Sequence, residues 1–273
     1  MSSPTFHHRC EAAAPMAHSW LIFDIGNTAV KWGRFEGAHL RSTGRLSLDA
    51  SALASVSAWR TVLAPLCHES SAQAGIVSVV ADAIPAAEAA LNAHDVSVSV
   101  LDVEGPLPFA LAYETPDTLG ADRLAAAAGA WLQHGRDASR SVLALDAGTA
   151  LTCEVVHRNG TYLGGIIAPG PELLRDSLAR GTAQLPDVPL EQPSHPIGTS
   201  TQTALQSGII NGFISMARGL TDTLAATLPD TPHVVLTGGA APLLIGAMRR
   251  SCSHAPHLVL DGTRRLLTYR ASV

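Results

Sequence analysis

Two short segments of this chain place an aspartate, a glycine and polar side chains directly after a run of apolar residues. The first is Asp24-Ile25-Gly26-Asn27-Thr28 and the second is Asp146-Ala147-Gly148-Thr149-Ala150. A carboxylate at the end of a strand can bind a metal ion or its water ligands. Glycine lets the backbone approach an anion closely, and the residues after it supply N–H and hydroxyl donors. The pair therefore predicts two facing turns that bind one triphosphate from both sides.

Each turn taken alone also fits an ordinary strand end, because aspartate, glycine and asparagine are common turn residues. The pattern that follows each turn favours the phosphate interpretation. Both are followed by two predicted strands joined by a hairpin, and Asn-Gly is a strong hairpin signal. These strands are Ala29–Phe35 and His39–Leu46 around Glu36-Gly37, then Leu151–Arg158 and Thr161–Ala168 around Asn159-Gly160. A β-β-β unit is thus present twice.

Helices and strands alternate after each unit. The first half predicts helices over Ala50–Cys67 and Ile84–Ala93, with strands over Gly75–Val80 and Val96–Leu101. The second half predicts helices over Glu172–Ala179, Gln202–Thr227, Ala241–Arg249 and from Thr263, with strands over His233–Leu236 and His257–Leu260. The duplication predicts an α/β protein of two similar domains, each with a mixed central sheet and flanking helices. We expect the ligand in the cleft between them.

The predicted boundaries follow from this repeat. Residues 1–17 lack a continuous apolar run and are expected to be a disordered extension. Residues 18–118 are expected to form the first domain and 141–273 the second. Residues 119–140 contain a connecting helix, predicted over Gly120–Gln133.

A second group of polar residues precedes and begins that connecting helix. It contains Tyr113, Gly120, Ala121, Asp122 and Arg123. An acid in the first turn of a helix is stabilised by the helix dipole, which is explanation enough for Asp122. The same location also suits a carboxylate that accepts a proton from a substrate hydroxyl. Arg123 beside it can form paired hydrogen bonds to a carboxylate or an amide of the acceptor.

Composition limits the possible partners. The chain has 273 residues and a formal net charge of −5, so it offers no basic surface for nucleic acid or for an anionic membrane. Its four cysteines are far apart in the sequence, which favours reduced thiols and a cytoplasmic location over a disulfide framework or a zinc site. No apolar stretch is long enough to span a bilayer. Walker and Rossmann nucleotide-binding motifs are absent.

The motifs taken in order resemble the type III pantothenate kinases, within the acetate and sugar kinase/Hsp70/actin superfamily. The resemblance begins near Leu21 and continues to the C-terminus. It is carried by Asp24-x-Gly26-Asn27-Thr28-x-x-Lys31-Trp32-Gly33, Tyr113, Gly120-Ala121-Asp122-Arg123, Asp146-x-Gly148-Thr149-Ala150-x-Thr152 and Gly164-Gly165-x-x-x-Pro169-Gly170. It implies two ribonuclease H-like, actin-like ATPase domains and ATP-dependent phosphorylation of pantothenate.

The resemblance also implies a role for each matching residue. Asp122 matches the catalytic base, and Asp146 matches the aspartate that holds K⁺ or NH₄⁺. The ATP contacts are Asp24, Ile25, Gly26, Asn27, Thr28, Ala29, Val30, Lys31 and Thr149, with Mg²⁺ accompanying the nucleotide. The pantothenate contacts are Tyr113, Gly120, Ala121, Asp122, Arg123 and Thr182. Thr182 matches a threonine that the family supplies from the second subunit of a homodimer.

Two other functions fit the same phosphate turns. One is a phosphotransferase with a different acceptor, because the turns do not specify the acceptor. The other is a regulatory protein that senses a nucleotide. Neither a helix-turn-helix pattern nor a basic patch supports direct contact with DNA, and an intact Asp122-Arg123 pair favours catalysis.

Overall fold

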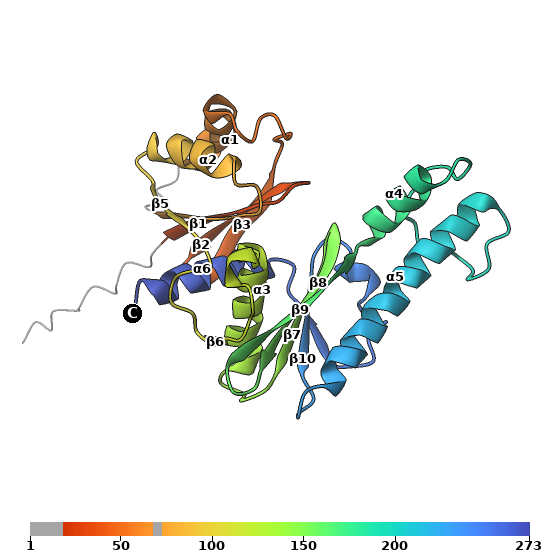
Figure 1. Cartoon of the computed structure of the whole chain (residues 1–273). Helices are drawn as coiled ribbons and strands as arrows, with labels where there is room; N and C mark the ends of the chain where they lie inside the picture. Colours follow the sequence, from red (N-terminus) through yellow and green to blue (C-terminus); the bar gives the residue numbers. More distant parts are fainter. Residues whose placement is uncertain (1–18, 68–72) are drawn as a thin grey trace, which may run out of the picture.

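The chain folds into two sheets, each covered by helices (Figure 1). The computed structural model describes residues 19–67 and 73–273. The predicted disordered extension, residues 1–17, lies outside the described residues. Within the described residues, no helix is long and apolar enough to cross a membrane.

The first sheet has the strand order β3-β2-β1-β4-β5. Strand β1 pairs antiparallel with β2 and parallel with β4, so the apolar strand that carries the first turn lies at the centre of the sheet. Helices α1 and α2 cover one face and enclose a core that includes Phe23 and Trp59. The bounds are β1 (Ser19–Ile25), β2 (Val30–Glu36), β3 (His39–Leu46), α1 (Val56–Cys67), β4 (Gln73–Ser78), α2 (Ala83–Asn92) and β5 (Ser97–Val100).

The second sheet repeats this arrangement. Its order is β11-β10-β7-β8-β9-β6, so β7 takes the place of β1, with β8 antiparallel on one side and β10 parallel on the other. A short strand, β6, adds to the far edge beside β9 and has no counterpart in the first sheet. The duplication predicted from the sequence is confirmed. The bounds are β6 (Ala110–Leu111), β7 (Val142–Ala147), β8 (Ala150–His157), β9 (Thr161–Pro169), β10 (His233–Thr237) and β11 (Cys252–His254).

Two helices, α3 (Ala121–Ala130) and α6 (Leu258–Arg270), lie between the sheets. They pack against each other, α6 against β1 and β4, and α3 against β7 and β8. Small residues permit this close approach, since a side chain at Gly262 would collide with the carbonyl of Ala125. A π-helical turn, Trp131–Gly135, follows α3 and leads toward β7. The last helix of the chain therefore connects the first sheet, through α3, to the second.

Helices α4 (Pro171–Gly181) and α5 (Thr201–Ala226) project from the outer side of the second sheet (Figure 1). The proline-rich segment between them has no helix or strand. It is held against α5 by two side chains. Gln206 donates a hydrogen bond to the carbonyl of Pro189 at 3.0 Å, and Ser207 donates to the carbonyl of Pro196 at 2.6 Å.

Four predicted elements were wrong in type or extent. The segment predicted as a helix, Ala241–Arg249, contains only a short 3₁₀ turn over Ala241–Leu243, and Gly246 then adopts a positive φ of 81° that regular helix does not allow. The strand predicted over His257–Leu260 is instead the start of α6, so this last helix begins at Leu258 rather than at Thr263. Its three apolar residues are buried because α6 packs against both the first sheet and α3, and a short apolar run does not distinguish a strand from a buried helix. Helix α1 begins at Val56 rather than at Ala50.

Candidate active site

The two aspartate turns occupy equivalent positions, at the carboxyl ends of the central strands β1 and β7. Each is closed by a backbone hydrogen bond from its glycine: Gly26 N–H donates to the carbonyl of Ala29, and Gly148 N–H donates to that of Ala150, both at 3.0 Å. Ile25 and Val30 have buried side chains, so in the first turn they can offer a ligand only their backbone. The geometry of each turn thus exposes backbone and hydroxyl groups above a rigid, buried strand.

The tips of the two turns meet. The hydroxyl oxygens of Thr28 and Thr149 lie 3.1 Å apart and are hydrogen-bonded, although the two residues are far apart in the sequence. The first turn belongs to one sheet and the second turn to the other. The two turns therefore face each other, as predicted.

Three carboxylates and one lysine surround this meeting point. Lys31 Nζ lies 3.4 Å from Asp24 Oδ2, since the two residues are paired across β1 and β2. Burial raises the pKa of Asp24, Lys31 opposes the rise, and the charge of Asp122 adds to it. Burial likewise raises the pKa of Asp146, to about 6, with Lys31 lowering it and the charges of Asp24 and Asp122 raising it further. The three aspartates are thus close enough to repel one another electrostatically.

A site with three carboxylates and one lysine favours cations. No group of three acidic, histidine or cysteine side chains that could hold a metal is present in the part of the chain that the structure describes. A cation at these turns would therefore need ligands of another kind, such as hydroxyls, backbone carbonyls, water or phosphate oxygens. Mg²⁺ is commonly bound in that way, with one or two carboxylates, several waters and substrate phosphates.

Asp146 owes its burial partly to Gly238, the residue after β10. Gly238 has a positive φ of 91°, and a side chain there would collide with Asp146 Oδ1 and with the backbone of Ala147. This glycine therefore allows the end of β10 to close over the second turn. At Gly239, the next residue, a side chain would meet no atom within 4 Å, so the backbone there lies open.

The predicted acceptor cluster is assembled at the start of α3. Asp122 lies in the first turn of the helix, and its Oδ1 accepts a hydrogen bond from the backbone N–H of Arg123 at 2.8 Å. Gly120 precedes the helix, where a side chain would press against the Asp122 carboxylate. The Arg123 guanidinium lies over the ring of Tyr113, with 6.0 Å between Cζ and the ring centre. Ala121 is the first residue of the helix.

The comparisons with known proteins agree on one family. The family model for type III pantothenate kinase matches residues 20–223. A type III pantothenate kinase from Chlorobium luteolum is 35% identical over 264 residues, covering 94% of this chain and 96% of that protein. Another from Anaeromyxobacter dehalogenans is 33% identical over 253 residues, covering 90% and 97%. This chain belongs to the type III pantothenate kinase family.

Solved structures that resemble this family member share its fold. The ethanolamine utilization protein EutJ from Carboxydothermus hydrogenoformans superposes with a TM-score of 0.53 at 14% identity, covering 89% of this chain and 88% of that one. A glucokinase from an Antarctic psychrotroph gives a TM-score of 0.51 at 12% identity, covering 92% and 99%. The two sheets thus form the actin-like ATPase and sugar kinase fold, as predicted.

One predicted site residue of the family pattern lies apart from the others. Thr182 follows the last turn of α4 and is exposed, and its hydroxyl donates to the carbonyl of Leu178 in the same helix at 2.9 Å. Among the described contacts, none joins Thr182 to Asp122, Arg123 or Tyr113. The position on a projecting helix leaves it accessible to a second molecule (Figure 1).

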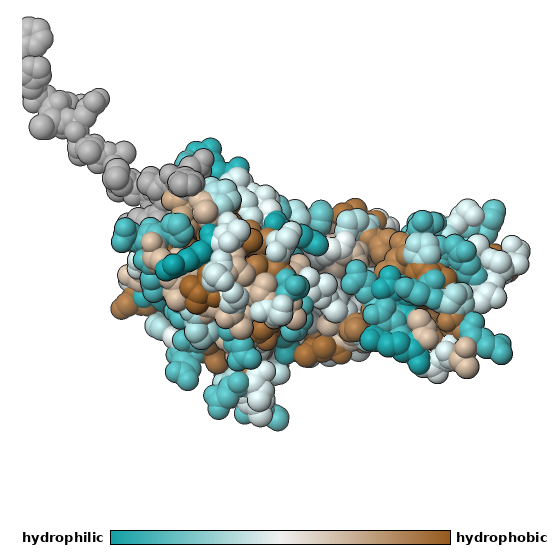
Figure 2. All heavy atoms as spheres, turned by 90° about the horizontal axis from the view of Figure 1, so that it is seen from above, coloured by the Kyte–Doolittle hydropathy of each residue, from teal (hydrophilic) through white to brown (hydrophobic). Residues whose placement is uncertain are grey.

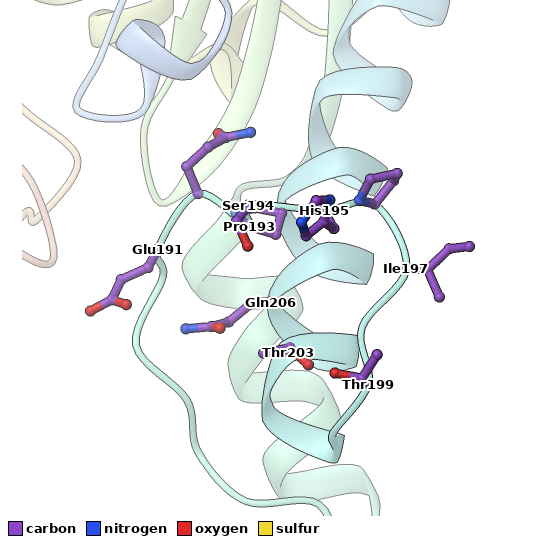
Figure 3. Close-up of a pocket in the computed structure, with 10 residues that line it drawn as sticks. Glu191, Pro193, Ser194, His195, Ile197, Thr199, Thr203 and Gln206 are labelled. Atoms are coloured by element: carbon purple, nitrogen blue, oxygen red, sulfur yellow. The ribbon is translucent and has the colours of Figure 1, made fainter.

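A cavity of about 540 Å³ also lies in this projecting part, away from the two turns (Figure 3). The proline-rich loop and the first turns of α5 line it, among them Glu191, His195, Thr203 and Gln206. No residue of either aspartate turn contributes to its wall. The cavity is therefore separate from the candidate active site.

Two residues of the site, Glu154 and Tyr162, were not predicted from the sequence. Arg123 donates from Nε and Nη2 to the two carboxylate oxygens of Glu154, at 2.7 and 2.9 Å. The Tyr162 hydroxyl donates to the same carboxylate at 2.6 Å. A signal for Glu154 was present in the sequence, because it is a single charge within the mostly apolar run from Leu151 to Val156. Charged residues are almost never fully buried unless they are paired.

Proposed function

We propose that this chain transfers the γ-phosphoryl group of ATP to the primary hydroxyl of pantothenate, giving 4′-phosphopantothenate, the first step of coenzyme A biosynthesis. The observation that carries the proposal is the meeting of the two turns beside Asp122 in a member of the type III pantothenate kinase family. Phosphoryl transfer depends mainly on positioning and charge stabilisation, which such a site can provide.

The first turn and Thr149 bind the phosphates of ATP in this proposal. The backbone N–H groups of Asn27, Thr28 and Ala29 and the hydroxyls of Thr28 and Thr149 are the proposed donors, since the Gly26 N–H already closes the turn. Lys31 supplies the positive charge. Mg²⁺ bound with the nucleotide offsets phosphate charge, and the carboxylates of Asp24 and Asp122 are the nearby groups that can hold its waters. Asp146, whose pKa is raised to about 6 mainly by burial, gains most from an added cation, K⁺ or NH₄⁺.

Asp122 acts as the general base. Its position in the first turn of α3 places it beside both phosphate turns and next to Arg123. The carboxylate accepts the proton of the pantothenate hydroxyl as the oxygen attacks the γ-phosphorus. Gly120, Ala121, Arg123 and Tyr113 form the wall that holds the acceptor.

A homodimer completes the acceptor site in the same proposal. Thr182 is remote from Asp122 within one chain, so a second copy would have to supply it. The projecting part carries exposed apolar side chains between polar ones (Figure 2), among them Leu173 and Leu178 on α4 and Ile197 in the following loop. Leu163 and Ile167 are exposed on β9, the strand before α4. A side chain at Gly208, Gly212 or Gly219 would meet no atom within 4 Å, which leaves one side of α5 open to a partner.

The direct test is ADP release by purified protein supplied with Mg²⁺-ATP, K⁺ and pantothenate. We expect release that depends on pantothenate and that forms 4′-phosphopantothenate, detected by mass spectrometry. Release with another alcohol but not with pantothenate would assign a different acceptor. Folded protein that binds ATP without turnover on any acceptor would favour the nucleotide-sensing alternative.

A further inference from the structure

Glu154 is a fully buried charge beside the acceptor wall. It lies in β8 with 0% of its surface exposed, between the buried neighbours Cys153 and Val155. Three donors reach its carboxylate: Nε and Nη2 of Arg123, and the hydroxyl of Tyr162. The group is thus satisfied from α3 on one side and from β9 on the other.

Stability alone gives little reason for this pair. The cost of removing two charges from water can exceed what a buried ion pair returns, and apolar residues of similar volume often stabilise a fold equally well or better. Burial by itself lowers the pKa of Arg123, and the hydrogen bonds and charge of Glu154 more than reverse that effect. Because an arginine side chain stays charged in any case, what the pair adds is a fixed direction for the guanidinium.

The glycines of β9 make room for the arrangement. A side chain at Gly165 would collide with the carbonyl of Cys153 and would lie 3.0 Å from Glu154 Oε2. Gly164 has a positive φ of 100°, and a side chain there would lie 3.3 Å from the ring of Tyr113. The Gly164-Gly165 pair therefore admits both the buried carboxylate and the ring that faces Arg123.

We propose that Glu154 is a positioning residue for the acceptor, in an inference that rests on the proposed kinase function. It acts through Arg123 and does not touch the substrate. Glu154 holds two of the five N–H donors of the guanidinium, which sets the plane of the remaining donors above Tyr113. Because Arg123 follows Asp122 directly, the same pair also fixes the first turn of α3. Glu154 thus aligns the acceptor wall with the general base.

The test compares substrate dependence in two variants of the purified full-length protein. In Glu154→Gln, which removes the charge while keeping the shape, we expect the KM for pantothenate to rise about tenfold or more, the equivalent of about 1.4 kcal/mol. The KM for ATP should stay within about twofold. Tyr162→Phe keeps the Arg123 pair and loses one hydrogen bond, so it should shift the pantothenate KM in the same direction by a smaller factor.

A matched structural control is Asp230→Asn. Asp230 accepts hydrogen bonds from the backbone N–H of Ser141 at 2.9 Å and from its hydroxyl at 2.6 Å. Ser141 precedes β7, at the end of the strand far from Asp146, and Asp230 belongs to no proposed substrate site. We expect it to lower the Tm without changing either KM.

The inference is overturned if Glu154→Gln and Tyr162→Phe leave the pantothenate KM within about twofold of wild type, or if they raise both KM values equally. Should Glu154→Gln not fold, Tyr162→Phe decides. Absence of pantothenate-dependent turnover in wild type would instead overturn the proposed function.

Discussion

The two aspartate turns have the same place in the fold but different electrostatic surroundings. In the first, the strand residue paired with Asp24 is Lys31, so the carboxylate has a cation of its own. In the second, the residue paired with Asp146 is Thr152. The described residues form no ion pair with Asp146, and its pKa rises to about 6, first through burial. The two turns thus share their backbone pairing, but only the first has an ion pair of its own, and Lys31 acts on Asp146 from the first turn. This difference is the basis of the monovalent cation proposed beside Asp146.

The largest effect is expected at Asp122, whose charge acts on the aspartates of both turns. Asp122→Asn removes the proton acceptor and should lower turnover by about 10²–10⁴-fold. Binding of ATP, measured by isothermal titration, should weaken far less than turnover, because the proposed phosphate donors are backbone groups, hydroxyls and Lys31, which the substitution leaves in place. A variant that turns over at the wild-type rate would remove Asp122 from the role of base.

The contrast between Lys31 and Thr152 predicts a requirement for a monovalent cation. Replacing K⁺ by Na⁺ should lower the rate by at least about tenfold, a loss of about 1.4 kcal/mol of transition-state stabilisation. Thr152→Lys would give the second turn the lysine of the first, and its rate should depend on K⁺ by less than about twofold. The ADP-release assay in each salt measures both. Full wild-type activity in Na⁺ alone would contradict the cation site.

The raised pKa of Asp146 predicts how that requirement changes with pH. Below about pH 6 the carboxylate is protonated, and a proton must leave before a cation binds. The half-saturating K⁺ concentration should then rise about tenfold for each pH unit below 6 and stay constant above it. Rates measured across a K⁺ series from about pH 5 to about pH 8 provide the check. A half-saturating K⁺ concentration that does not change with pH would be inconsistent with Asp146 as a ligand of the cation.

The smallest effect is on stability. The folded-state pKa of Asp146, about 6, lies above its usual value of 3.8, so between these values the folded state binds more protons than the unfolded state. Stability from this group is therefore lost as pH rises through that window. Asp146→Asn has no charge to bury, so at a pH above this window its Tm should exceed that of wild type. The expected rise is about 2–4 °C for each kcal/mol gained in the free energy of unfolding. Both proteins are measured in K⁺-free buffer, and the difference should vanish near pH 3.8. A lower Tm for the variant at neutral pH would reverse the sign we predict.

Patterns local to the sequence predicted much of the fold. The two turns, both hairpins and the long helices depend on apolar spacing and on residues such as Asn159-Gly160, which act within a few positions. The errors in element type fell at Ala241–Arg249 and His257–Leu260, where the local pattern was compatible with more than one element. The start of α1 was also misplaced. Helix α6 packs against both the first sheet and α3, and the residues near Leu258 do not indicate these contacts in the sequence.

The sequence by itself determined which groups are available: two copied turns, an acid at the start of a helix and a lysine in one copy only. The tertiary structure decided how they interact. Only the folded chain brings Thr28 to Thr149, surrounds Asp146 with other carboxylates and directs Arg123 onto Glu154. The physical reason is that pKa values and ion pairs depend on distance and on exclusion of water, and both are set by residues that are remote along the chain.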